Sequence, residues 1–255
     1  MTVPRHELGK NIFLDISIDH KGPQLQSMLQ SEKEDVRKFM LDNFYEDASV
    51  PKALRLKETS PKFEFLEDEL NLMLDSPACI ACIDLSTNKI VSAIINTVWQ
   101  VDNDFDAFKV DGIEYLNLAA VIAHEVTIDP LMRIVIWRDY QFQLIYHLLQ
   151  AHAQKRGADY ILYGGMGYVM PEYRGLGFAP LFWSIGAKWA QSNNSLFSFI
   201  GTYQHFSGQV HRTHPGKFSS LGFIPFDSLK FNPHKSNNDS VFKGIESGMN
   251  LMAVI

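Results

Sequence analysis

The stretch from Asp159 to Gln191 constrains the fold of this chain more than any other part of its sequence. Residues 160–169 (YILYGGMGYV) are rich in aromatic, β-branched and glycine residues, which predicts a buried strand. Residues 178–191 place apolar side chains at helical spacing, which predicts a helix. Between them, residues 170–177 (MPEYRGLG) are too polar and too rich in glycine to continue either element. The sequence therefore predicts a strand, a glycine-rich turn and a helix in immediate succession.

A turn of this kind suits a diphosphate group. The first N–H groups of a helix have no intrahelical partner, and they lie at the positive end of the helix dipole. Arg174 adds a full positive charge, and Gly175 and Gly177 let a phosphate approach the amides because they carry no side chain. Nucleotide hydrolases place Gly-Lys-Ser/Thr at this point, and none follows Gly177. A dinucleotide fingerprint needs a third glycine where this chain has Met170.

Composition limits the classes of protein that fit. A chain of 255 residues with 46% hydrophobic residues can bury a sizeable core, and we expect one domain. The net charge of −6 argues against a nucleic-acid partner and favours a cationic substrate such as an amine. No apolar run is long enough to span a membrane, and the N-terminus lacks the apolar segment of a signal peptide. We expect a cytoplasmic monomer or homodimer without a membrane partner.

The two cysteines are Cys79 and Cys82, in the segment PACIACIDL. Their spacing can indicate redox or metal chemistry, but no further ligands complete a zinc site. Residues three apart on a strand point to opposite faces, so we interpret both as core cysteines and expect no metal.

Turn and periodicity signals divide the rest of the chain into helices and strands. The predicted elements are a strand at 11–18, a helix from 31, an acidic turn at 45–51, a helix through 66–74, a hairpin of strands at 79–84 and 90–99, a helix at 130–156, and strands at 196–203, 219–223 and 250–255. This order predicts an α/β (α+β) fold in which a mixed sheet carries helices on both faces.

Residues 169–179 (VMPEYRGLGFA) resemble the acetyl-CoA diphosphate loop of the GNAT superfamily of N-acetyltransferases. Arg174, Gly177 and Ala179 occupy the fixed positions of its pattern, Arg/Gln-x-x-Gly-x-Gly/Ala. The order of predicted elements is similar, and so is the Leu-Gly-Phe at 221–223. The resemblance implies the GNAT fold, with a mixed, mostly antiparallel central sheet, as a single domain over 1–255 with an insertion at about 101–156.

The resemblance also implies acetyl-CoA as cofactor, held by the end of the strand and by the loop. The residues that it assigns to the cofactor are Gly167, Tyr168, Val169, Arg174, Gly175, Leu176, Gly177, Phe178 and Ala179. Backbone groups of residues 167–169 are expected to pair with the pantetheine arm like an added strand. Gly164 and Gly165 mark either a bulge that splays this strand from its neighbour or a close contact with a neighbouring element.

Acetyl transfer to an amine needs a proton acceptor. An alkylamine with a pKa of about 10 is unprotonated in roughly one molecule in a thousand at pH 7, which costs roughly 4 kcal/mol. Residues 39–50 resemble the arylalkylamine (dopamine-type) N-acetyltransferases of insects and their nematode relatives, in which helix one leads into Asp-Glu-Pro-Leu and the Glu is the base. Here Ala48 stands at that Glu position, and Glu46 and Asp47 are the nearest carboxylates. Both also fit a solvated acidic turn.

The same family uses serines after the strand that follows the diphosphate helix. Ser207 matches one of them and Tyr203 lies near the other, although the segment is longer here. His205 and His211 are alternative proton acceptors, because imidazole titrates near neutrality. The tyrosine that often serves the superfamily as general acid is replaced by Phe218.

The resemblance implies the first of two candidate functions, and a departure from it favours the second. The first is an acetyl-CoA-dependent N-acetyltransferase that transfers acetyl directly to a small primary amine, of arylalkylamine type. The second is a GNAT-like protein that binds CoA or senses acyl-CoA without catalysis, which Ala48 favours.

Overall fold

The computed structural model describes eleven segments of the chain: residues 2–3, 12–17, 30–56, 64–74, 79–84, 87–102, 129–202, 218–225, 229–234, 240–242 and 248–254. The chain divides into two compact units. The first unit comprises Met1–Asp47, Phe63–Gln100 and Ala158–Phe199. The second comprises Ala48–Lys62, Val101–Gly157 and Ile200–Ile255.

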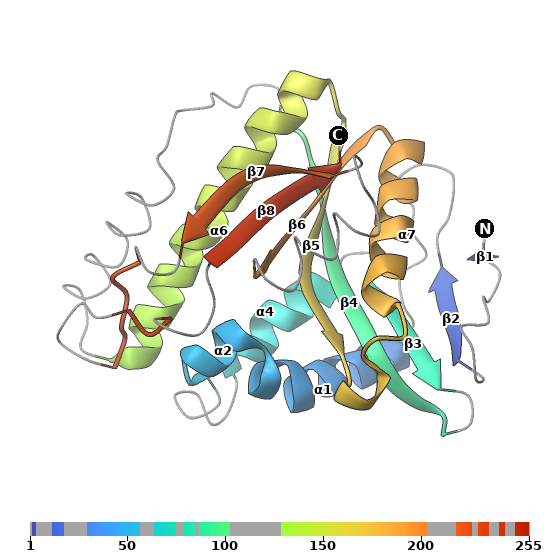
Figure 1. Ribbon diagram of the computed structural model, residues 1–255, viewed down its shortest axis with the longest axis horizontal. Coiled ribbons are helices and arrows are strands. Elements are labelled where there is room, and N and C mark those ends of the chain that lie inside the picture. Colours follow the sequence, from blue (N-terminus) through green and yellow to red (C-terminus); the bar gives the residue numbers. More distant parts are fainter. Residues whose placement is uncertain are drawn as a thin grey trace. The chain divides into compact units, whose positions relative to one another are not determined.

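The first unit is built on a sheet whose strands follow the order β1-β2-β3-β4-β5-β6 (Figure 1). These strands are β1 (Thr2–Val3), β2 (Ile12–Ser17), β3 (Ile80–Asp84), β4 (Lys89–Gln100), β5 (Tyr160–Val169) and β6 (Ser195–Thr202). Neighbouring strands are antiparallel from β1 to β5, whereas β5 and β6 are parallel. The predicted mixed, mostly antiparallel sheet is confirmed, including the β3–β4 hairpin and both ends of β5.

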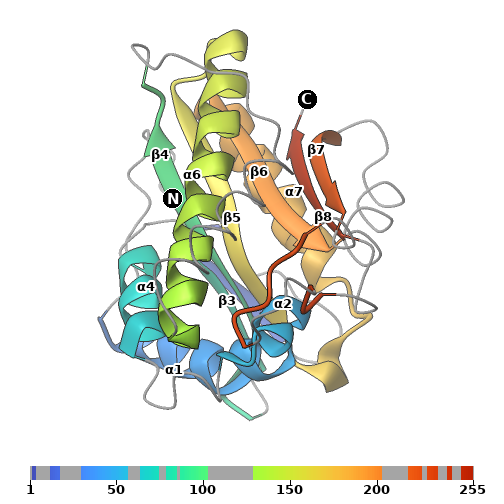
Figure 2. The same cartoon turned by 90° about the vertical axis from the view of Figure 1, so that its left-hand side faces the viewer.

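Helices cover both faces of this sheet, as predicted (Figure 1, Figure 2). They are α1 (Gln30–Asp47), α4 (Glu64–Leu74) and α7 (Phe178–Ser192). On one face, Phe39 of α1 meets the ring of Tyr168 edge-on, with the ring centroids 5.8 Å apart. On the other face, Phe178 and Phe182 of α7 form a buried cluster with Ile94 and other side chains of β3 and β4.

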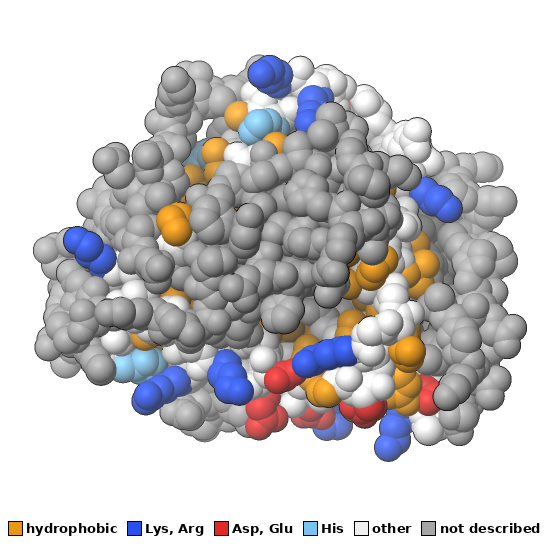
Figure 3. All heavy atoms as spheres, viewed as in Figure 1, with side chains coloured by type: hydrophobic (Ala, Val, Ile, Leu, Met, Phe, Trp, Pro, Cys, Tyr) orange, Lys and Arg blue, Asp and Glu red, His pale blue; other side chains and the backbone are white. Residues whose placement is uncertain are grey.

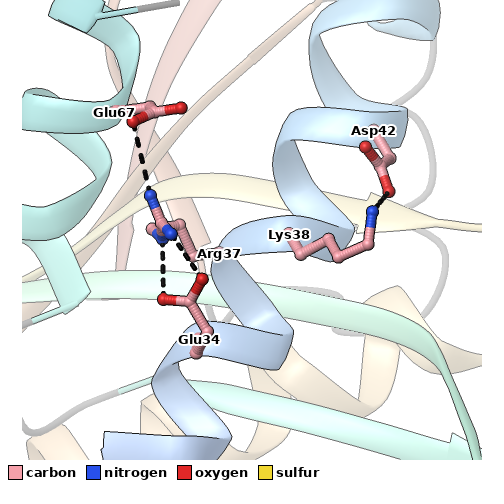
Figure 4. A network of polar contacts seen from close by, with 5 residues as sticks. All are labelled: Glu34, Arg37, Lys38, Asp42 and Glu67. Atoms are coloured by element: carbon pink, nitrogen blue, oxygen red, sulfur yellow. Dashed lines mark hydrogen bonds and ion pairs between the residues drawn. The ribbon is translucent and has the colours of Figure 1, made fainter.

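Polar contacts join α1 to α4 at the surface (Figure 4). Arg37 Nε donates to Glu34 at 3.0 Å within α1, and Arg37 also donates to Glu67 of α4 at 3.4 Å. Lys38 and Asp42, one turn apart on α1, form an exposed ion pair at 2.7 Å. Exposed ion pairs contribute about 0–1 kcal/mol each, so buried apolar contacts must supply most of the packing energy between the two helices.

The end of α1 differs from the sequence prediction. An acidic turn was expected over residues 45–51, but α1 continues to Asp47 and only Ala48 separates it from α2 (Ser49–Ala53). Tyr45 is 1% exposed, and its hydroxyl contacts the sulfur of Met166 on β5 at 3.5 Å. The helix continues because burial of Tyr45 against the sheet stabilises one more turn, which local polarity does not reveal.

The second unit contains α2, α6 (Pro130–Arg156) and the antiparallel strands β7 (Phe218–Pro225) and β8 (Gly248–Val254). The predicted helix α6 is confirmed with both ends. Asp129 caps it by accepting from the N–H of Leu131 at 3.1 Å, and Gly157 ends it in a left-handed conformation with φ of 63°. None of the helices in the described segments is both long and apolar enough to cross a membrane.

The cysteines belong to the packing of the first unit. Cys82 on β3 is fully buried, and Cys79 lies half-buried just before that strand. The thiol of Cys79 donates to the carbonyl of Met73 at 3.8 Å, and burial raises its pKa to about 12. Burial also raises the pKa of Cys82. Neither thiol forms a reactive thiolate near neutral pH, which agrees with core cysteines.

Candidate cofactor site

The strand β5 is paired differently along its two halves. Its whole length pairs with β4, from Gln100 opposite Tyr160 to Ser92 opposite Val169. On its other edge, only Tyr160–Gly164 pair with β6. In the described segments, no strand pairs with that edge beyond Gly164. The second half of β5 therefore has one open edge.

A bulge lies where the pairing changes. Ile95 lies opposite Met166 and Asn96 opposite Gly164, so Gly165 is an extra residue on β5. A side chain at Gly165 would overlap the terminal methyl of Met73 on α4. A side chain at Gly164 would lie 3.1 Å from Cβ of Phe199 on β6. The sequence left a bulge and a close contact as alternatives, and both are present.

The hydrogen bonds around Tyr168 identify which backbone groups face the open edge. The carbonyl of Tyr168 accepts from Ser92 Oγ at 2.9 Å, so it points toward β4. Because carbonyls alternate in direction along a strand, those of Gly167 and Val169 point toward the open edge. Arg174 Nε donates to the Val169 carbonyl at 3.1 Å. The carbonyl and N–H of Gly167 and the N–H of Val169 are thus directed at the space where a ligand could add as a strand.

The glycine-rich loop follows β5 directly, through the short 3₁₀ helix η1 (Pro171–Tyr173). Gly175 and Gly177 have positive φ angles of 81° and 92°, which other residues rarely adopt. Within the described segments, apart from each glycine and its chain neighbours, no atom lies within 4 Å of the position where a Cβ would stand on either glycine. These glycines are therefore required by the backbone conformation, and the space above them is open.

The helix α7 begins at the end of this loop with Gly177 as its N-cap. Its first intrahelical hydrogen bond runs from the N–H of Leu181 to the carbonyl of Gly177 at 3.1 Å. The N–H groups of Phe178 and Ala179 precede that bond, so they have no intrahelical acceptor. Pro180 has no N–H. The loop thus ends at a helix terminus with outward-facing donors, the arrangement that binds phosphates.

Arg174 contacts two side chains on the α1 side of the sheet. Its guanidinium forms an ion pair with Asp47 at the end of α1 and lies 5.6 Å from the ring centroid of Tyr168. The hydroxyl of Tyr168 donates to Asp47 at 3.3 Å. Burial raises the pKa of Tyr168, and the negative charge of Asp47 raises it further. A phosphate that binds Arg174 must therefore compete with Asp47 for it.

The predicted proton acceptors fall into two groups. Glu46 and Asp47 lie in the last turn of α1 and are exposed. Figure 3 shows acidic side chains on the part of the surface where Figure 1 places α1. Ala48 follows Asp47 and offers no proton acceptor. Ser207, His205 and His211 lie outside the described residues. No group of three metal-ligating side chains gathers within the described segments.

Sequence reasoning missed two contacts of this site. The first is the pairing of Arg174 with Asp47, which are 127 residues apart in sequence. The second is Asp84, whose carboxylate accepts from the hydroxyl of Tyr173 at 2.7 Å. Asp84 ends an apolar strand and is 8% exposed. A carboxylate ending a buried strand was the only local signal for it.

The structure of this chain is similar to solved structures of other proteins. An arylalkylamine N-acetyltransferase 2 from the mosquito Aedes aegypti superimposes with a TM-score of 0.64 at 15% sequence identity, over 95% of this chain and 98% of that protein. The chain has the GNAT fold. A second Aedes aegypti protein, provisionally assigned as arylalkylamine N-acetyltransferase 7, superimposes with a TM-score of 0.61 at 17% identity, over 95% of this chain and 86% of that protein.

A polyamine N-acetyltransferase from Drosophila melanogaster, which forms N-acetylagmatine, also shares the GNAT fold. Its TM-score is 0.54 at 12% identity, over 96% of this chain and 99% of that protein. No protein-family model matches the sequence, and no curated protein matches it. At these identities the similarity establishes the fold, and the chemistry must be argued from the residues.

Proposed function

We propose that this protein is an acetyl-CoA-dependent N-acetyltransferase that transfers acetyl directly to a small primary amine. The observation that carries the proposal is the open half of β5, which leads straight into a glycine loop and a helix N-terminus. These features provide, in sequence, a strand edge for an extended amide-containing chain and a set of N–H donors for a diphosphate. Acetyl-CoA has these two parts in the same order.

The residues of this chain fit the cofactor part by part. The backbone groups of Gly167 and the N–H of Val169 would pair with the pantetheine amides. The open loop at Gly175 and Gly177 and the amides of α7 would receive the diphosphate, since no side chain of the described residues fills the space above the glycines. Bound acetyl-CoA would supply the thioester carbonyl. The protein would orient this carbonyl toward the amine.

Transfer requires that the amine nitrogen attack the carbonyl and lose a proton, while the C–S bond breaks and CoA leaves as its thiolate, which takes a proton from solvent. A carboxylate at the end of α1 would accept the amine proton. We favour Glu46, because it directly follows the aromatic pair Phe44 and Tyr45. Its side chain is also longer than that of Asp47, which accepts from Arg174 and Tyr168. Because it accepts these two hydrogen bonds, Asp47 is better suited to hold Arg174 than to accept the proton of the amine.

The acceptor is proposed to be an arylalkylamine or a polyamine. The solved structures with this fold are named for arylalkylamines and for a polyamine, and an acidic end of α1 suits any of these cations. Ala48 supports a second function, that of a CoA-binding or acyl-CoA-sensing protein without turnover, because an alanine replaces the glutamate expected at this position.

Incubation of the purified protein with acetyl-CoA and single amines, with detection of free thiol, tests both functions. Turnover is expected with at least one arylalkylamine or polyamine. Tight binding of acetyl-CoA without turnover on any amine would favour the second function. Absence of acetyl-CoA binding would contradict both.

The same assay tests the proton acceptor. Glu46→Gln is expected to lower kcat by about 10²–10⁴-fold, the usual contribution of a general base, while acetyl-CoA affinity is unchanged. Asp42→Asn is the matched control, because Asp42 is an exposed carboxylate one turn earlier on α1. Unchanged turnover in Glu46→Gln would rule out Glu46, and loss of turnover in His205→Ala instead would assign the role to that histidine.

A further inference from the structure

The side chain of Tyr173 is held at both of its ends. Its ring packs against the buried cluster formed by β3, β4 and α7, which includes Cys82 and Phe178. Its hydroxyl donates to Asp84 at the end of β3, at 2.7 Å. Hydrogen bonding to Asp84 is the main cause that raises the pKa of Tyr173, so the hydroxyl keeps its proton at neutral pH.

Tyr173 and Phe178 flank the exposed part of the loop. Arg174, Gly175, Leu176 and Gly177 are exposed, whereas Tyr173 is half-buried and Phe178 is 3% exposed. The loop is therefore a span of four exposed residues fixed at each end in the same apolar cluster. Only the Tyr173 end is also fixed by a hydrogen bond to a carboxylate.

We propose that the Tyr173–Asp84 hydrogen bond is a positioning device for the diphosphate-binding loop, and that Tyr173 is a positioning residue for the cofactor. This inference rests on the proposed function of the loop. The pair holds the end of η1 in place, and η1 in turn sets the direction of Arg174 and of the loop amides. Neither Tyr173 nor Asp84 contacts the ligand in this arrangement.

The physical reason lies in the two glycines. Glycine has the greatest backbone freedom, so a loop with two of them loses the most conformational entropy when it closes on a ligand. A fixed loop has already lost part of that freedom, and binding costs less free energy. The carboxylate at Asp84 also orients the hydroxyl in one direction, since an ionised carboxylate only accepts hydrogen bonds.

The test compares acetyl-CoA with S-acetylpantetheine, which lacks the diphosphate, by isothermal titration calorimetry on the full chain. Tyr173→Phe keeps the ring and removes the hydroxyl. Acetyl-CoA affinity is expected to fall about tenfold, the lower end of the range for a hydrogen bond to a charged group. S-Acetylpantetheine affinity is expected to change less than twofold. Asp84→Asn keeps a carbonyl acceptor for the hydroxyl and is expected to retain most of the acetyl-CoA affinity.

Tyr160→Phe is the matched control, because Tyr160 lies at the opposite end of β5. It is expected to leave both affinities unchanged. Equal losses for the two ligands in Tyr173→Phe would show that the pair acts through general stability and would overturn the positioning role. No loss for either ligand would also overturn it. Absence of acetyl-CoA binding by the unaltered protein would instead contradict the proposed function.

Discussion

The two halves of β5 belong to one strand and have opposite surroundings. Tyr160–Gly164 have a strand on each side, and Ile161, Leu162 and Tyr163 are at most 2% exposed. Beyond Gly165, β4 is the only described strand that pairs with β5, and Gly167 is exposed. The first half satisfies its backbone groups within the sheet. The second half directs several of them away from the sheet, where water or a ligand must pair with them.

This difference in pairing lets one strand contribute to core packing with its first half and to ligand binding with its second half. Changes near the closed half should lower the free energy of unfolding and leave cofactor affinity unaltered in the folded protein. Changes near the open half and its loop should lower cofactor affinity and leave the free energy of unfolding nearly unaltered. Variants that violated this separation would show that the two halves do not act independently.

The largest effect is expected from Phe197→Ala, beside the closed half. Phe197 lies opposite Leu162, is 1% exposed and packs against Gly186 of α7. Its truncation should lower the free energy of unfolding by about 3–5 kcal/mol, measured by chemical denaturation. The folded variant should bind acetyl-CoA as the unaltered protein does. A large loss of acetyl-CoA affinity at temperatures where the variant is folded would show that the closed half also contributes to cofactor binding.

Next comes Gly177→Glu, in the loop after the open half. It places a negative charge in the proposed diphosphate site and forces a side chain into a φ of 92°. Acetyl-CoA affinity should fall about a hundredfold, from backbone strain and charge repulsion together. Gly177→Ala shares the strain without the charge and should lose less. Unchanged affinity in a folded Gly177→Glu variant would remove this loop as the cofactor site.

Arg174→Ala should have a smaller effect. A charge-assisted contact to phosphate contributes about 1.5–3 kcal/mol, and the existing ion pair with Asp47 offsets part of it. We expect about a tenfold loss of CoA affinity and little loss for pantetheine. Asp47→Asn should act in the opposite direction and raise CoA affinity, because it releases Arg174. Equal losses for CoA and pantetheine would indicate that Arg174 acts through packing.

The smallest effect concerns the pH dependence of Tyr168. Its pKa is raised in the folded protein, so the associated stability is present below about pH 10 and is lost as the pH rises through the folded-state pKa. Tyr168→Phe should lower the free energy of unfolding by about 1 kcal/mol at pH 8. That difference should narrow above pH 10. If the difference in the free energy of unfolding stayed constant from pH 8 to pH 11, a raised pKa of Tyr168 would be contradicted.

Much of the fold was predictable from local sequence. The bounds of β5 and the stop of α6 at Gly157 followed from composition, periodicity and a helix-ending glycine. The end of α1 was not predictable, because the burial of Tyr45 depends on Met166 of a strand 121 residues away. In the site, the glycine loop could be identified because its signal is contiguous.

The side-chain partners of the loop could not be identified in the same way. Arg174 was predicted to face a phosphate, and its contact with Asp47 depends on how α1 ends beside β5. Asp84 and Tyr173 are 89 residues apart, and nothing in either local segment indicates the other. Pairings of this kind arise from tertiary structure, so a single sequence does not contain a readable signal for them.

The bulge at Gly165 determines which face each later residue of β5 occupies. Before it, Gly164 lies beside Phe199, which stacks on Trp183 of α7. After it, Tyr168, again an even-numbered residue, meets Phe39 of α1 on the opposite face. The extra residue therefore shifts, by one position, which residues of the strand face each side of the sheet. A strand that kept Gly165 but paired regularly would turn Tyr168 toward α7 and away from Asp47, whereas deletion of Gly165 would remove the bulge and leave Tyr168 on its present face.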